Sequence, residues 1–144
     1  MRDILFVILE RVTMKRSEIR EQLFKVLFQA EFYPPENLEA QFDIYTQEIP
    51  NAKESELEYM RHKFLDLVAH LEDIDQAIND VTEGWTTSRM GKVELTILRL
   101  AYYEIKYDEE VPDRVAVNEA VELAKQFGRD DSSSFVNGVL KKFL

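Results

Sequence analysis

The sequence predicts an all-α fold of six or seven helices. In most of the chain, apolar residues recur at every third or fourth position, which is the spacing of one face of a helix. No segment alternates apolar and polar residues like a half-buried strand, and there is no internal repeat or long linker. The 144 residues, 45% of them hydrophobic, suffice for one domain or two small subdomains with a buried core.

Two helices are predicted in the first third of the chain. Ser17 is the expected N-cap of the first, and Pro34-Pro35 follows its end because proline does not fit a helix interior. A shorter helix runs from about Glu36 towards Glu48 and closes before Pro50. The first helix is expected to bury Leu23, Phe24, Leu27 and Phe28.

A long amphipathic stretch from Leu57 to Ile78 is the next predicted element, with one break near residues 72–75 and an end at Gly84. Residues 92–107 then form a strongly apolar helix. Because this helix is hydrophobic on most of its circumference, we expect it at the centre of the fold. Val111-Pro112 separates it from the last two helices.

The last two helices have the clearest boundaries. An apolar face from Val117 to Phe127 marks the first, and Gly128 is expected to end it in the left-handed conformation. Asp131 or Ser132 can cap the second. The apolar face of the second helix consists of Phe135, Val136, Val139 and Leu140.

These C-terminal segments resemble the NusB family of bacterial RNA-binding transcription antitermination factors. Residues 118–125 read Asn-Glu-Ala-Val-Glu-Leu-Ala-Lys, and Ser132 is followed by Phe-Val-Asn-Gly-Val-Leu from residue 135. Residues 91–104 also look like the central helix of that family, and Trp85 and Arg89 stand where it tends to place a Trp and an Arg. The resemblance covers roughly Met14 to Leu144 and is strongest at the C-terminal end.

The resemblance implies one RNA-binding domain, residues 14–144, made of two packed small helical bundles. Their boundary is expected near Trp85, which gives an N-terminal subdomain of residues 14–84 and a C-terminal one of residues 85–144. Residues 1–13 precede the resemblance and are expected to be an optional extension, the alternative being a helix extension that packs on the bundle. Their apolar run from Ile4 to Leu9 is far shorter than a membrane span.

Composition excludes several kinds of site and leaves a question about charge. The absence of cysteine removes disulfides, thiolate nucleophiles and cysteine zinc sites, and it fits a reducing cytoplasm. A net charge of −10 argues against a nucleic-acid partner. However, the acidic residues are concentrated in the middle of the chain, where residues 31–83 carry fourteen acidic and three basic side chains. Residues 1–30 carry four acidic and six basic side chains, and residues 84–144 carry ten acidic and nine basic ones. The two ends of the chain could therefore serve RNA, and the acidic middle either attracts a basic protein or is a solvated face.

The first helix opens with Lys15, Arg16 and Arg20, which either contact phosphates or form an ordinary solvated face. NusB-like proteins start with an arginine-rich segment that binds RNA, so the resemblance favours the first role. Here the segment is thinned, because Ser17 and Glu18 stand where fuller versions carry basic residues.

The start of the last helix contains a second candidate RNA contact. Asp131 and Phe135 lie one helical turn apart, and without the resemblance they are an N-cap beside a core phenylalanine. The family places an acid and an aromatic of its RNA surface here, so Phe135 becomes a candidate platform for base stacking. Asp131 would then cap the helix, accept from a base amino group, or limit affinity. Further phosphate contacts are expected from Arg129, Lys141 and Lys142.

Asn137-Gly138 lies within the apolar face of that helix. Because glycine costs about 1 kcal/mol relative to alanine inside a helix, something close to the backbone is expected. The two candidates are packing against residues 98–102, which we favour, and room for RNA beside Phe135.

Glu94 matches a family position that faces the partner NusE, a ribosomal protein that also serves in antitermination. The other interpretation is a solvated glutamate on a helix face. Because NusE is basic, the acidic character of the chain would complement it.

No constellation for catalysis or metal binding is evident. His62, Asp66 and His70 share a helical face, but a helical wheel places them opposite the apolar face, towards solvent. The serines at 132–134 match no nucleophile motif, and no glycine-rich phosphate loop occurs. We therefore expect neither an enzyme nor a cofactor.

By resemblance, the chain is expected to bind boxA-type single-stranded RNA in nascent ribosomal RNA transcripts together with NusE, in an antitermination complex with RNA polymerase. Two alternatives are a domain related to the N-terminus of ribosomal RNA cytosine methyltransferases and a purely protein-interacting helical bundle. The sequence leaves monomer and homodimer open.

Overall fold

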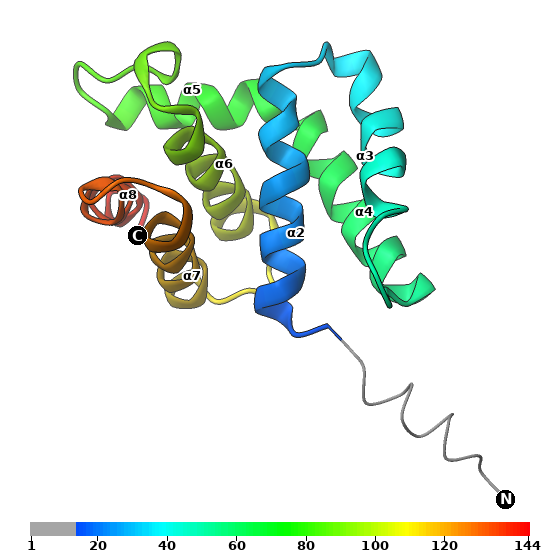
Figure 1. Ribbon diagram of the computed structural model, residues 1–144. Helices are drawn as coiled ribbons and strands as arrows, with labels where there is room; N and C mark the ends of the chain where they lie inside the picture. The colour runs from blue at the N-terminus through cyan, green and yellow to red at the C-terminus, as the bar shows by residue number, and fades with distance from the viewer. Residues whose placement is uncertain (1–13) are drawn as a thin grey trace, which may run out of the picture. The chain divides into compact units, whose positions relative to one another are not determined.

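The computed structural model describes residues 14–144, so the predicted extension of residues 1–13 lies outside the described residues. The described part contains seven α-helices, three short 3-10 helices and no strand, which confirms the all-α prediction (Figure 1). No helix within it is long and apolar enough to cross a lipid bilayer. The α-helices are α2 (Arg16–Phe28), α3 (Leu38–Thr46), α4 (Glu54–Ala69), α5 (Leu71–Val81), α6 (Lys92–Tyr107), α7 (Asp113–Phe127) and α8 (Ser132–Lys141), and the 3-10 helices are η1 (Gln29–Glu31), η2 (Pro35–Asn37) and η3 (Thr87–Arg89).

The chain divides into two compact units between Leu65 and Asp66, inside α4. This division differs from the expected boundary near Trp85. The reason is that α5 belongs with α6: the side chain of Arg99 on α6 makes two hydrogen bonds to the carboxylate of Asp75 on α5, of 2.8 and 2.7 Å.

The N-terminal unit has an aliphatic and aromatic core between α2, α3 and the first half of α4. The rings of Phe42 and Phe64 stack with centroids 5.0 Å apart. The helix α2 begins at Arg16 with Lys15 as N-cap, so the prediction of Ser17 as N-cap is wrong, and Phe28 is only half-buried. The buried side chains of α2 are Arg20, Leu23, Phe24, Val26 and Leu27, so three of the four apolar residues predicted to be buried are buried.

The C-terminal unit is built around α6, as its apolar sequence predicts. Side chains around the whole circumference of α6 are buried, because α5, α7 and α8 all pack against it (Figure 1). The ion pair of Arg99 with Asp75 lies in this packing, with the Arg99 side chain only 8% exposed. The buried aliphatic residues of α6 include Leu95, Ile97, Leu98 and Leu100.

The junction of α4 and α5 lies at His70, a few residues before the predicted break at 72–75. Its ring Nδ1 donates to the carbonyl oxygen of Asp66 at 2.8 Å and its ring stacks on Tyr107 with centroids 4.1 Å apart. The Tyr103 hydroxyl donates to the Asp66 carboxylate at 2.6 Å. Asp66 and His70 therefore face α6, so the prediction that they point to solvent is wrong for both, and only His62 is exposed.

The two glycines of the C-terminal segment, Gly128 and Gly138, do not have the roles that the sequence predicts. Gly128 is extended (φ −94°, ψ −166°) and not left-handed, and its role is close approach: a Cβ there would lie 2.6 Å from the Cβ of Ser132. Gly138 is exposed, and a Cβ there would meet no heavy atom within 4 Å. The favoured interpretation, that Gly138 packs closely against residues 98–102, is therefore wrong.

Replacing Asp75 by alanine is expected to lower the free energy of unfolding by about 2 kcal/mol, because the Arg99 guanidinium would lose its carboxylate in a largely buried place. Urea denaturation measures the change. Asp80→Ala is the matched control on α5, since the Asp80 carboxylate is exposed and accepts a hydrogen bond from Gln76 on the same helix. Equal stability of both variants would contradict the role of the pair.

Alanine substitutions at Gly138 and Gly128 are expected to change the stability of the fold in opposite directions. Gly138→Ala raises the free energy of unfolding by about 0.5–1 kcal/mol, because alanine is the better helix former and has room. Gly128→Ala lowers it by about 1–3 kcal/mol, because the new methyl group overlaps Ser132 and the Ala124 carbonyl oxygen. Thermal melting of the two variants beside the unchanged protein tests the pair, and a stable Gly128→Ala protein would refute the close approach.

Candidate nucleic-acid interface

A surface pocket of about 450 Å³ in the C-terminal unit brings several predicted site residues together. We call it the aromatic pocket. One side comes from the segment between α5 and α6, and the other from the turn between α7 and α8 and the first turn of α8. Three of its lining residues, Arg129, Asp131 and Phe135, were predicted to bind RNA and a fourth, Glu94, to bind a partner.

Two aromatic rings form walls of this pocket. The Phe135 ring meets the Trp85 ring edge to face, with centroids 6.4 Å apart and planes at 69°. Trp85 is 55% exposed, and the Arg89 guanidinium lies over its ring, 6.0 Å from the centroid. Trp85 is held by its backbone, because Gly84 turns the chain with φ at +76° and the Trp85 amide donates to the Thr82 carbonyl. The pocket thus presents accessible ring surface at a fixed place.

Charges of both signs surround the rings. Arg89 and Arg129 supply cations, and Glu94 and Asp131 supply carboxylates. Asp131 occupies the N-cap position of α8, but its side chain makes no capping hydrogen bond and is exposed. Its carboxylate is therefore available to a ligand.

Glu94 is tied to α8. Its Oε1 accepts a hydrogen bond of 2.5 Å from the Ser132 hydroxyl, and the Ser132 oxygen accepts one of 2.8 Å from the Arg129 backbone N–H. Of the two predicted capping residues, Ser132 is therefore the one whose side chain binds the turn. Contact of Glu94 with a partner stays a prediction.

The cations at the end of α8 do not line the pocket. The Lys142 ammonium donates to the carbonyl oxygen of Val81 at the end of α5, at 2.8 Å. Lys141 is exposed on the surface of the C-terminal unit. Phe135, Gly138 and Lys142 share one stripe of α8, because they are three or four residues apart.

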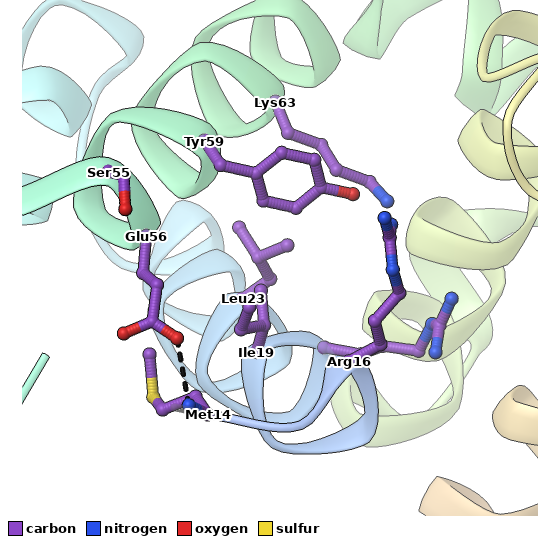
Figure 2. Close-up of a pocket in the computed structure, with 9 residues that line it drawn as sticks. Met14, Arg16, Ile19, Leu23, Ser55, Glu56, Tyr59 and Lys63 are labelled. Carbon is purple, nitrogen blue, oxygen red and sulfur yellow. Dashed lines mark hydrogen bonds between the residues drawn. The ribbon is translucent and has the colours of Figure 1, made fainter. Parts of the chain in front are cut away.

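A second pocket, of about 330 Å³, lies in the N-terminal unit between α2 and α4, and we call it the cationic pocket (Figure 2). Of the three predicted RNA-binding cations of the N-terminal segment, Arg16 and Arg20 line it and Lys15 does not. The Arg16 guanidinium lies 5.8 Å from the centroid of the Tyr59 ring, and the Lys63 ammonium 5.7 Å from it.

The wall beside these cations is fixed by Glu56. The carboxylate of Glu56 accepts from the Met14 backbone N–H at 2.8 Å, which Figure 2 shows, and from the Lys53 backbone N–H at 2.9 Å. Backbone donors therefore stabilise the Glu56 carboxylate, and the pocket combines Arg16 with the largely buried Arg20 and Lys63 beside the Tyr59 ring.

Four pocket residues were missed as site candidates from the sequence. Tyr59 and Lys63 share one face of α4 at a spacing of four, but they stand in the acidic middle of the chain, where a basic site was not sought. Trp85 and Arg89 were noted only as a family resemblance. Their spacing of four on either side of a Thr-Thr-Ser segment was the available signal.

Comparison with known proteins identifies relatives along nearly the whole chain. The family model described as the NusB family matches residues 17–144. A transcription antitermination protein NusB from Agathobacter rectalis is 45% identical over 130 residues, which are 90% of this chain and 99% of the relative. The protein of that name from Lachnoclostridium phytofermentans is 46% identical over 91% of this chain and 99% of its own length.

Solved structures agree with this match. NusB from T. maritima superposes with a TM-score of 0.83 at 32% identity and covers 91% of each chain. A structure of the antitermination factors NusB and NusE in complex with dsRNA contains a chain with a TM-score of 0.72 at 25% identity, over 88% of this chain and 93% of that one.

Proposed function

We propose, since the chain belongs to the NusB family, that it binds a boxA-type single-stranded segment of nascent ribosomal RNA transcripts together with ribosomal protein NusE. It does so within an antitermination complex with RNA polymerase. The observation that carries the RNA part is the aromatic pocket, in which Trp85 and Phe135 expose ring surface between Arg89 and Arg129. The solved complex of NusB, NusE and dsRNA supports the choice of partners.

The aromatic pocket suits an unpaired base. A base splayed out of a single strand can stack on Phe135 or Trp85, which is worth about 1–3 kcal/mol per base. Arg89 and Arg129 are placed to meet the flanking phosphates, and the unbonded Asp131 carboxylate can accept from a base amino group. The exposed Gly138 next to Phe135 leaves room for the RNA along α8.

The cationic pocket is a second proposed RNA contact. Arg16 and Arg20 can neutralise phosphates there, and the Tyr59 ring beside them adds a surface for a base or sugar. Lys15, Lys141 and Lys142 would contribute phosphate contacts at the edges of the two surfaces.

The acidic segment of residues 31–83 is the proposed attraction for NusE, a basic protein, with Glu94 as a further contact. If RNA and NusE touch each other or a shared surface, each strengthens the binding of the other.

Titration of a boxA-like RNA, with and without NusE, tests the proposal, and the emission of the single tryptophan Trp85 reports on the pocket. We expect tighter binding when NusE is present, and an affinity that falls as salt rises because phosphate contacts release counterions. Binding that NusE leaves unchanged and that salt does not affect would instead favour a protein-interacting bundle.

Phe135→Ala is expected to weaken RNA binding about tenfold, because the base loses its stacking platform. Phe143→Ala is the matched control, since Phe143 packs on Tyr102 and does not line the aromatic pocket. Circular dichroism melting should show that both variants keep a cooperative transition. Loss of the transition in Phe135→Ala would assign Phe135 to the core, and equal RNA binding by both variants would exclude it from the RNA surface.

A further inference from the structure

We infer that Glu94 is a positioning residue, which fixes the turn at residues 128–131 through Ser132 and so places Arg129 and Asp131 in the aromatic pocket. This inference rests on the proposed RNA-binding function of that pocket. This role lies inside the molecule and is separate from the proposed contact of Glu94 with NusE.

The hydrogen bonds around Ser132 carry the inference. A serine hydroxyl has one proton to donate, and here the proton goes to Glu94 while the oxygen accepts the Arg129 N–H. Ser132 is only 1% exposed, and within the fold its hydroxyl donates to Glu94. Without an acceptor at position 94 the buried hydroxyl would be left unsatisfied, which is unfavourable.

Two glycines keep space around this bond. A Cβ at Gly91 would collide with the Glu94 carboxylate, and one at Gly128 would collide with Ser132. The two glycines therefore leave room for the side chains of Glu94 and Ser132 in the positions that this hydrogen bond requires. The Glu94 carboxylate also lies in the first turn of α6, where the helix dipole favours negative charge.

The turn has few other side-chain anchors. Asp131 makes no capping bond to α8, and Arg129 and Asp130 are exposed. The bond of Ser132 to Glu94 thus links the turn directly to the central helix of the unit. A shift of the turn would move the charged groups of Arg129 and Asp131 away from the two aromatic rings of the pocket. The RNA could then no longer contact the rings and these charges at the same time.

Glu94→Gln separates positioning from charge, because the amide oxygen of glutamine still accepts from Ser132 while the negative charge is gone. We expect Glu94→Ala to speed hydrogen exchange of the Arg129 amide and to weaken RNA binding, each about fivefold, and Glu94→Gln to restore both. Ser132→Ala should match Glu94→Ala in RNA affinity, and the double variant should be no weaker than either single one. Glu122→Ala, an exposed carboxylate on α7, controls for the loss of charge.

Each outcome decides one of the two claims. A Glu94→Gln protein as weak as Glu94→Ala would overturn positioning and assign Glu94 to a charge contact, as would unchanged exchange of the Arg129 amide in Glu94→Ala. If the unchanged protein binds no RNA, the proposed function fails, and amide exchange in the free protein still decides whether Glu94 orders the turn. If Glu94→Ala does not fold, Ser132→Ala and Glu94→Gln carry the comparison.

Discussion

The C-terminal unit depends on the burial of α6 on all sides. A helix that is apolar around most of its circumference is stable in water only when other helices cover it, and here α5, α7 and α8 do so. Burial of α6 begins at Leu95, and the preceding residue Glu94 bonds to Ser132 at the start of α8. The aromatic pocket lies at that meeting point, so its position follows from the core packing and not from the loops alone.

The same burial explains why polar side chains of α6 have defined partners. Arg99 and Tyr103 emerge from a helix with little solvent around it, and each needs a group to satisfy it. Asp75 on α5 and Asp66 at the end of α4 supply carboxylates for them. These bonds hold α5 and the last residues of α4 beside α6.

The helices and the buried faces were accessible from periodicity, whereas contacts that depend on distant parts of the chain were not. The spacing of apolar residues predicted the buried side of α6, and in α8 it predicted Val136, Val139 and Leu140 correctly, whereas Phe135 is only half-buried. The roles of the two glycines were wrong, since Gly128 is set by the distance to Ser132 and Gly138 by the absence of a neighbour. Likewise, the hydrogen bond of Ser132 to Glu94 joins residues thirty-eight positions apart, and no local pattern encodes such a pair.

The net charge of the chain is a poor guide to its surfaces, and screening gives the physical reason. At physiological salt, exposed charges more than about 8 Å apart act nearly independently, so a ligand responds to the local set of charges and not to the total of −10. In the cationic pocket Arg16 and Lys63 flank Tyr59, while backbone donors compensate Glu56. In the aromatic pocket the Glu94 carboxylate is engaged by Ser132, and the guanidinium of Arg89 stacks on Trp85. An acidic protein can therefore keep surfaces suited to RNA, because carboxylates such as Glu56 and Glu94 are bound within the fold, while the Asp131 carboxylate stays open to a ligand.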